Sequence, residues 1–375
     1  MSTDIQSSER SPRLERLLSF LSQDPHNDSL RADAASLALD ERQFELAQDL
    51  LGNVQDSPML LNLKGLAALG AGQYEEAATV FEHLRDGGED SPAICFNLAW
   101  AKAMLGEFSD VEALLDDEAI AVSPRAAALK VEALHHLDRH EEGLIEGKRL
   151  ADLCPDNELL MGALATLAMD AGELGLARDY ATRSGNTPEG LVARGMLLLD
   201  EGNPADALDL FDQALAQKPQ SARAWIGSGL GLLTRDRADE AAEALEKGAQ
   251  LFGDHLGSWI AAGWANFTNQ DYAKARACFE RACDLDPNFA ESHGGLAVLD
   301  ILEGDLESAK RRCEVALRLD RTCLGGALAK SMLLEREGKP AAAQRIRELA
   351  LSLPVGPDGK TIGAALANFA ATKRR

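Results

Sequence analysis

The sequence predicts an all-α fold of about ten stacked helix pairs, and three observations lead to that prediction. A residue pattern recurs every 34 positions over most of the 375-residue chain, a period that is too long for one helix and suits a helical hairpin. Small residues recur at two fixed places in this pattern, and glycine recurs at a third. Together they predict two helices that cross closely and are joined by a tight turn.

The first expected elements are a disordered segment and a capping helix. Residues 1–10 are polar and are expected to be disordered. Residues 11–27 form the predicted N-terminal capping helix. A stack of hairpins leaves an apolar face at each end, and this helix would cover the first one. The apolar residues that share one side of it are Leu14, Leu17, Leu18 and Leu21.

Ten repeat units are expected next. The units in residues 28–187 are irregular, with successive starts 30 to 34 residues apart, whereas the units in residues 188–357 keep the 34-residue step. Because the missing residues fall at unit ends, the second helix or its exit turn is expected to be shortened there. Residues 184–188 are the best candidate for a joint between the two halves. The predicted unit starts are Asp28, Pro58, Pro92, Pro124, Glu158, Pro188, Ala222, Leu256, Ala290 and Leu324.

A C-terminal capping helix over residues 358–375 completes the predicted array. Ile362, Leu366 and Phe369 would lie on one side of this helix and cover the second apolar end. The basic residues 373–375 suit the C-terminus of a helix, where the dipole favours positive charge.

Three positions within the unit explain why the helices pair. Position 20 is alanine in eight of the ten units, and position 8 is a small residue in nine. Small residues at both places allow the two helices of a unit to approach closely. Position 15 is glycine in six units, where it would end the first helix with a positive φ.

Three units carry a known repeat pattern, in the residues Trp225, Gly229 and Leu232; Trp259, Gly263, Ala275, Phe279 and Pro287; and Gly195, Ala207, Phe211 and Pro219. On these residues the chain resembles the tetratricopeptide repeat (TPR) proteins, of the kind that serve as cytoplasmic scaffolds in bacteria. The resemblance covers about residues 28–353 and implies a right-handed superhelical solenoid. It also implies that the first helices line a concave groove in which partner proteins are commonly held.

The residues expected in that groove are mostly apolar. Positions 2, 5, 9 and 12 share one face of the first helix, and a solvent-facing helix face is usually polar. An apolar face of this size would suit a partner protein. Packing within the chain and self-association of the chain remain open as alternative readings of the same face. The predicted protein-binding residues are Phe96, Trp100, Val192, Met196, Leu199, Ile226, Leu230, Leu233, Ile260, Trp264, Phe267, Val298 and Ile301.

The ligand mode best known in the resembled family is absent. Its carboxylate clamp needs Lys at position 5 and Asn at position 9 of one unit, and Asn at position 6 of the next. No unit has Lys at position 5 or Asn at position 9, and Asn97 is the one asparagine found at position 6. The chain carries 61 acidic against 38 basic side chains, a net charge of −23. Nucleic acid and anionic membranes are therefore poor candidates as partners. The expected partner is an apolar segment, either an amphipathic helix or an extended peptide, possibly flanked by basic residues.

No catalytic, cofactor or metal site is predicted. His135, His136 and His140 cluster near a predicted turn, which does not place them on one helix face for a metal. Cys278, Cys283 and Cys313 fall on second helices and are expected to be buried apolar residues. The N-terminus lacks the pattern of a signal peptide, and no apolar run is long enough for a transmembrane helix, so a cytoplasmic location is expected.

The expected function is that of a non-catalytic scaffold, adaptor or chaperone that holds a segment of a partner protein. Two alternatives remain open from the sequence. The chain could be a structural protein that assembles with copies of itself, or it could be a regulatory subunit of an enzyme.

Overall fold

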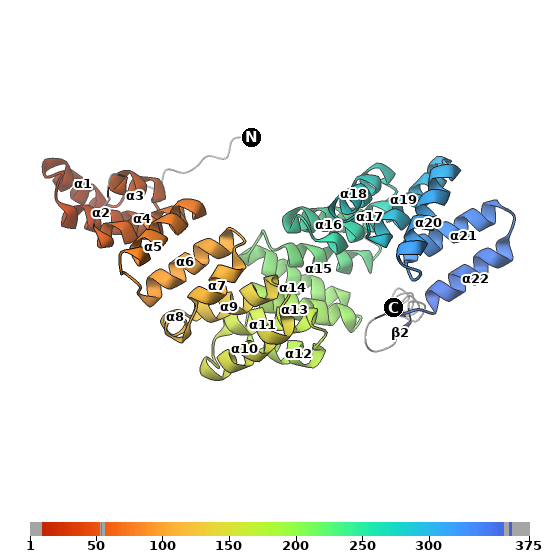
Figure 1. Cartoon of the computed structure of the whole chain (residues 1–375), viewed down its shortest axis with the longest axis horizontal. Helices are drawn as coiled ribbons and strands as arrows, with labels where there is room; N and C mark the ends of the chain where they lie inside the picture. Colours follow the sequence, from red (N-terminus) through yellow and green to blue (C-terminus); the bar gives the residue numbers. More distant parts are fainter. Residues whose placement is uncertain (1–9, 53, 55–56, 356–359, 362–375) are drawn as a thin grey trace. The chain divides into compact units, whose positions relative to one another are not determined.

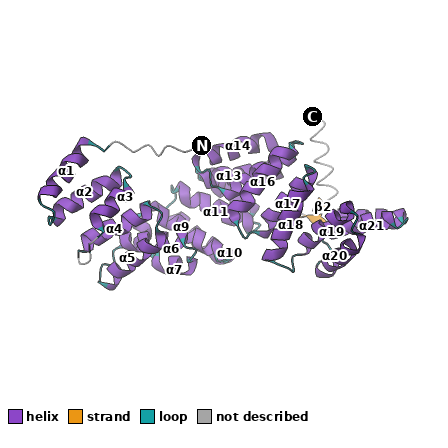
Figure 2. Ribbon diagram, turned by 90° about the horizontal axis from the view of Figure 1, so that it is seen from above, coloured by secondary structure: helices purple, strands orange, loops and turns teal. Residues whose placement is uncertain are grey.

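The computed structural model describes residues 10–52, 54, 57–355 and 360–361, and these residues are almost entirely helical. They form twenty-two helices joined by short turns, together with one two-residue antiparallel strand pair (Figures 1 and 2). The predicted all-α fold class is confirmed. The chain divides into two compact units, Met1–Glu173 and Leu174–Arg375.

The elements follow one another as hairpins in both units (Figure 1). The N-terminal unit contains α1 (Pro12–Gln23), α2 (Asp28–Asp40), α3 (Phe44–Leu51), α4 (Pro58–Gly70), α5 (Tyr74–Asp86), α6 (Pro92–Met104), α7 (Phe108–Leu114), α8 (Asp117–Val122), α9 (Pro124–His136), α10 (His140–Leu153) and α11 (Glu158–Asp170). The C-terminal unit contains α12 (Leu174–Arg183), α13 (Pro188–Asp200), α14 (Pro204–Gln217), α15 (Ala222–Leu233), α16 (Ala238–Phe252), α17 (Leu256–Thr268), α18 (Tyr272–Leu285), α19 (Ala290–Glu303), α20 (Leu306–Leu319), α21 (Leu324–Arg336), α22 (Pro340–Leu351), β1 (Pro354–Val355) and β2 (Lys360–Thr361).

Each of the ten residues predicted to start a unit is the first residue of a helix, beginning with α2 and ending with α21. Local chemistry explains these starts. Pro188 opens α13, where its missing N–H costs nothing, and the Thr187 hydroxyl before it accepts a hydrogen bond from the Gly190 amide. Asn27 and Asn157 cap α2 and α11 in the same way.

The turn inside each hairpin has one shared conformation. The six glycines at position 15 all have a positive φ, between 73° and 89°. In the other four units the same position also has a positive φ although the residue is not glycine. The left-handed region costs an ordinary residue roughly 1–2 kcal/mol, so the hairpin geometry overrides the local preference at these sites. The four residues are Arg42, Asp138, Asp236 and Gln270.

The core of the C-terminal unit depends on phenylalanines that fill space left by glycines. A Cβ atom at Gly195 of α13 would lie 2.6 Å from Cε1 of Phe211, which projects from α14 of the same hairpin. Gly227, on the next first helix, faces the same ring, since a Cβ atom there would lie 2.4 Å from Cζ of Phe211. Phe279 has the equivalent place between Gly263 and Gly295. The small residues at position 8 therefore admit the aromatic side chain of the second helix as well as bringing the helices close.

The irregular spacing appears as short second helices. The helices α3, α7 and α12 have 8, 7 and 10 residues, against 14 residues in α14, α18 and α20. An additional six-residue helix, α8, follows α7. The boundary between the units falls between Glu173 and Leu174, which is earlier in the chain than the segment 184–188 predicted as a joint. Within that segment Ser184 and Thr187 are buried, and Arg194 of α13 donates a hydrogen bond to the Gly185 carbonyl oxygen.

The two predicted capping helices have different outcomes. At the N-terminal end, α1 covers the first hairpin with Leu14 and Leu21, both of which are buried. At the other end, Lys360 and Thr361 form strand β2, so the helix predicted over residues 358–375 is wrong for these two residues. The remainder of that predicted helix, and residues 1–9 of the predicted disordered segment, lie outside the described residues.

Candidate protein-binding face

The thirteen predicted residues lie on the first helices of two separate units. Phe96 and Trp100 are on α6 of the N-terminal unit. The other eleven are on α13, α15, α17 and α19 of the C-terminal unit. The two groups therefore belong to different units.

Four of the predicted residues are buried in the core of the chain. Val192 and Ile260 are 5% and 9% exposed, and Val298 and Ile301 are completely buried. Val298 and Ile301 are buried because α21 packs against α19. The two helices are so close that a Cβ atom at Gly294 would lie 2.5 Å from the backbone nitrogen of Gly326 in α21. The prediction that these four side chains line the groove is wrong, because neighbouring residues of the chain enclose them in the core.

The other nine predicted residues are half-buried. On α13, Met196 and Leu199 pack against the cluster around Phe211. On α15, the side chains at positions 5, 9 and 12 pack against the cluster around Leu245. Each of these five apolar side chains thus has one side on the core and another side accessible. The three on α15 are Ile226, Leu230 and Leu233.

The two aromatic residues of α17 have most of their interactions within the chain. The Trp264 ring meets the rings of Phe267 and Phe279 edge-on, at centroid distances of 5.5 and 5.2 Å. Both Trp264 and Phe267 also pack against the cluster that contains Val298 and Ile301. The two aromatics are therefore mainly structural and form the edge of the accessible face.

A glutamate that was not singled out from the sequence ties this edge to the last hairpin. The Trp264 indole N–H donates to the Glu291 carboxylate at 3.2 Å. The same carboxylate accepts from the Gly325 amide at 3.0 and 3.1 Å and from the Cys323 thiol at 3.1 Å, at the N-terminus of α21. Burial and the nearby Glu291 charge raise the pKa of Cys323 well above its ordinary value. These contacts join α17 and the start of α21 to Glu291 of α19, and they help to close the inner side of α19. In the sequence, Glu291 could have been noticed as an acidic residue at position 2, which is one of the mostly apolar groove positions.

The aromatic pair of the N-terminal unit lies beside a cation. The ring centroids of Phe96 and Trp100 are 6.3 Å apart, and the Arg125 guanidinium carbon lies 5.9 Å from the Trp100 ring centroid. Arg125 is exposed at the start of α9. This surface therefore carries a positive charge beside its two aromatic rings.

The histidines make contacts within the chain. Of the three cysteines predicted to be buried, Cys278 and Cys313 are buried, whereas Cys283 is half-buried. His135 Nε2 lies 2.8 Å from Asp170 Oδ2, and the His136 ring stacks on Phe108 at a centroid distance of 4.1 Å. Over the described part of the chain, no three His, Cys, Asp or Glu side chains are grouped so that they could hold a metal ion. Cys278 is buried, which raises the pKa of its thiol to about 12 and disfavours the reactive thiolate.

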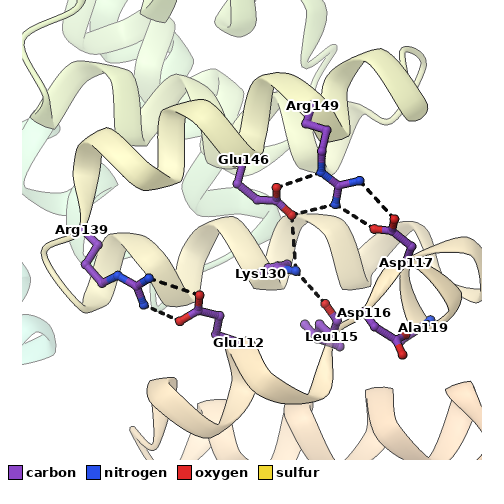
Figure 3. Close-up of polar contacts among 9 residues, drawn as sticks. All are labelled: Glu112, Leu115, Asp116, Asp117, Ala119, Lys130, Arg139, Glu146 and Arg149. Atoms are coloured by element: carbon purple, nitrogen blue, oxygen red, sulfur yellow. Dashed lines mark hydrogen bonds and ion pairs between the residues drawn. The ribbon is translucent and has the colours of Figure 1, made fainter.

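Charged side chains connect the additional helix α8 to its neighbours, as Figure 3 shows. Lys130 of α9 donates to the Leu115 carbonyl oxygen at 2.9 Å and lies 3.3 Å from the Glu146 carboxylate. Arg149 pairs with Glu146 at 2.8 Å and with Asp117 of α8 at 2.7 Å. The irregular part of the N-terminal unit is thus held together by ion pairs that the repeat pattern did not predict.

Two family models match within the C-terminal unit. Both describe the tetratricopeptide repeat, one over residues 192–255 and the other over residues 257–289. Residues 192–255 and 257–289 of this chain are therefore tetratricopeptide repeats. No helix in the described part of the chain combines the length and apolar character needed to span a bilayer.

The chain is similar in sequence to parts of two longer proteins. It is 27% identical over 186 residues to human protein O-mannosyl-transferase TMTC1, a match that covers 48% of this chain and 21% of that protein. It is 28% identical over 119 residues to the protein CTR9 homolog of Arabidopsis thaliana, covering 32% of this chain and 11% of that protein. The chain therefore spans about a fifth and about a tenth of the lengths of these relatives.

A solved structure shows the same fold over most of the chain. The APC/C hetero-tetramer Cut9-Hcn1 superposes with a TM-score of 0.57 at 15% identity. The match covers 90% of this chain and 77% of the other chain.

Proposed function

We propose that this chain is a non-catalytic protein-interaction scaffold that holds an apolar segment of a partner protein against α13 and α15. The observation that carries the proposal is the row of half-buried apolar side chains on the inner positions of these two helices. The five residues in this row, called the α13–α15 face from here on, are Met196, Leu199, Ile226, Leu230 and Leu233.

The composition of α17, the first helix that follows α15, supports a binding site on α13 and α15. Positions that a helix turns to solvent are usually polar, and α17 contains no charged residue at all. Half-buried apolar side chains on rigid helices lose little conformational entropy on binding, because the core already fixes their rotamers. Trp264 and Phe267 would contact a partner only at the edge of the face, since their rings are engaged within the chain. Phe96 and Trp100 remain a separate proposed contact on the N-terminal unit.

The chemistry of the partner follows from the face and from the charge of the chain. An apolar row along two adjacent helices suits an amphipathic helix or an extended segment with regularly spaced apolar residues. The net charge of −23 favours basic residues beside that apolar stretch, because they would be attracted to the acidic surface. The similar fold of Cut9, solved as a hetero-tetramer with Hcn1, supports an assembly role as a class. Roles as an adaptor or chaperone, and a cytoplasmic location, belong to this proposal.

A paired set of variants tests the proposal. Leu230→Gln and Leu233→Gln make the α13–α15 face polar at half-buried sites, at a cost of about 1 kcal/mol each to the free energy of unfolding. The control is Leu210→Gln, because Leu210 is also half-buried and packs against the Phe211 cluster, but from the second helix α14. The three variants and the parent chain are affinity-tagged and purified from the native cell, and retained proteins are quantified by mass spectrometry.

We expect the parent chain and Leu210→Gln to retain the same partner protein in equal amounts. Both face variants should retain at least about tenfold less of it, which corresponds to 1.4 kcal/mol of binding free energy. Circular dichroism of all four chains checks that the helices are intact. Equal retention by all chains would contradict the proposal. Retention of this chain alone, with loss in the face variants, would identify self-assembly instead.

A further inference from the structure

The tryptophan on α6 differs from the other three tryptophans of the chain in its hydrogen bonding. Trp225 and Trp259 donate their indole N–H groups to backbone carbonyl oxygens at 2.9 and 2.8 Å, and Trp264 donates to the Glu291 carboxylate at 3.2 Å. Within the described residues, the indole N–H of Trp100 has no acceptor, and its nitrogen atom is accessible rather than enclosed. This donor is therefore open to a ligand.

The repeat shows which group stands where an acceptor could be. Trp100 and Trp264 both occupy position 9 of their units, and the residue at position 2 of the following unit contacts each of them. Beside Trp264 that residue is Glu291, which accepts the indole N–H. Beside Trp100 it is Arg125, and a guanidinium group only donates. The N-terminal unit thus places two donors together without the carboxylate that the C-terminal unit supplies.

The Arg125 side chain is held in place without an anionic partner. Its guanidinium carbon lies 5.9 Å from the Trp100 ring centroid, a cation–π contact, and among the described residues it forms no ion pair. By contrast, Lys102 on the same helix as Trp100 lies 2.7 Å from both Glu82 and Glu107. A guanidinium packed on a ring keeps its N–H groups in a plane that matches the geometry of a carboxylate.

Apolar side chains lie on both sides of Arg125 in the row of position-2 residues. From the second unit to the fifth, this row consists of exposed residues on α4, α6, α9 and α11, which are Met59, Ala93, Arg125 and Leu159. Met59 is 53% exposed and Leu159 is 36% exposed. Because the single charge of this row has apolar neighbours on either side, a fitting carboxylate belongs to a side chain within an apolar segment rather than to the end of a chain.

We propose that this surface of the N-terminal unit binds an acidic side chain, glutamate or aspartate, in an apolar segment of a partner protein. The carboxylate accepts hydrogen bonds from the Trp100 indole and the Arg125 guanidinium, as Glu291 accepts from Trp264 in the other unit. Phe96, whose ring centroid is 6.3 Å from that of Trp100, contacts an apolar neighbour of the acidic residue.

This surface has the opposite charge preference to the α13–α15 face. The inference rests on the proposed role as a scaffold, to which it adds a second segment of different chemistry. The net charge of −23 does not prevent the contact, because repulsion from distant charges is screened beyond about 8 Å at physiological ionic strength. The donors beside the carboxylate therefore decide whether it binds.

Binding of defined peptides to the full-length chain tests this proposal. The probes are short peptides with acetylated N-termini and amidated C-termini, in which a central Glu, Gln or Lys is flanked by varied Leu, Phe and Ala residues. An array selects the flanking sequence, and fluorescence anisotropy measures the affinities. The best Glu peptide should bind at least about tenfold more tightly than the same peptide with Gln, because its hydrogen bonds are charge-assisted.

Variants of the two donors locate the site. Arg125→Glu should abolish the preference for Glu, because the new carboxylate takes the place that Glu291 has beside Trp264. Trp100→Phe keeps a ring for Arg125 but removes the N–H, and should weaken the Glu peptide at least about fivefold. The matched control is Arg16→Glu, an equal change of charge at an exposed residue of α1, which should leave the preference unchanged.

Other outcomes would overturn the proposal. These are the absence of a preference for Glu over Gln, a preference for Lys, and a Glu preference that survives in Arg125→Glu. A set of the same peptides with a free C-terminal carboxylate is measured in parallel, and binding of this set alone would assign the site to a chain end instead. Leu230→Gln should leave the Glu preference intact, so failure of the α13–α15 face is scored separately.

Discussion

Two helix crossings, one in each unit, have opposite arrangements of large and small residues. At the crossing in the C-terminal unit the large residue is Phe211 on the second helix α14, and the glycines that make room for it, Gly195 and Gly227, are on first helices. At the crossing in the N-terminal unit the glycine is Gly147 on the second helix α10, and the large residue that fills its place is Leu164 on the first helix α11. Each unit contains both arrangements, since Phe81 of α5 faces Gly65 of α4, and Ile226 of α15 faces Gly248 of α16. Both arrangements reach close packing, so each crossing needs complementary volumes, whereas the helix that supplies the larger side chain can differ.

Both units contain connected ion pairs. Around α8 in the N-terminal unit, Lys130, Glu146, Arg149 and Asp117 form a connected set of ion pairs over three helices (Figure 3). In the C-terminal unit, Arg276 and Arg312 both pair with the buried Asp300. We expect the region around Phe211 to respond most to changes in packing, and the region of α8 to α10 to respond to pH.

The largest effect is expected for Phe211→Ala. The ring is completely buried between two first helices, and its removal should lower the free energy of unfolding by about 3–5 kcal/mol. Because repeats contact mainly their neighbours, the loss should be concentrated in α13 to α15. Hydrogen exchange should show faster opening there and unchanged exchange in α2 to α6. An equal loss of protection in both units would contradict the account.

A smaller effect is expected for Gly147→Ala in the N-terminal unit. The added methyl group would overlap the Leu164 side chain, and overpacking of this kind costs about 1–3 kcal/mol. Leu164→Ala alone should also destabilise the unit, by leaving a cavity. The double variant should lose less stability than the sum of the two single variants, because the new methyl group fills part of that cavity. Additive losses in urea unfolding would show that the two residues do not share the same space.

The smallest effect is a pH dependence that comes from Glu146. Hydrogen bonding to Arg149, together with Lys130, lowers the pKa of this carboxyl group from 4.5 to about 2. A lowered pKa in the folded state contributes stability above about pH 4.5, and this contribution is lost as the pH falls toward 2. The stability difference between the parent chain and Glu146→Gln should therefore be about 1 kcal/mol at pH 6 and shrink by pH 3.

Urea unfolding at pH 6, 4 and 3 measures this difference. Glu141→Gln serves as the control, because Glu141 is an exposed carboxylate on the same helix α10. At pH 6 it should change the stability by less than Glu146→Gln does. A Glu146→Gln difference that is the same at pH 6 and pH 3 would contradict the assigned role of the ion pairs.

Much of the fold could be predicted from the sequence because the repeat fixes it locally. Glycine at position 15 marks the hairpin turn, and the structure places a positive φ there in all ten units. At Arg42 and Gln270 the residue type does not predict a positive φ, and only the position within the repeat predicts the turn. The additional helix α8 could not be predicted, because it lies where the spacing departs from the repeat and is held by contacts distant in sequence.

The candidate face was predictable only in part. Leu230 and Val298 both occupy position 9 of their units, but Leu230 is half-buried whereas Val298 is completely buried. The difference arises from Gly294, Gly325 and Gly326, which let α21 approach α19 and cover its inner side. Periodicity places residues on a face of a helix, whereas the distance between neighbouring helices decides whether that face is accessible.

The central claim is that a partner protein contacts the α13–α15 face. A photo-crosslinking amino acid placed at Leu230 in the native cell tests it most directly, with the same amino acid at Leu210 on α14 as the comparison. The account predicts one dominant crosslinked partner from position 230, with a crosslinked peptide that is rich in apolar residues, and no such product from position 210. The same products from both positions, or none from position 230 in a correctly folded chain, would contradict it.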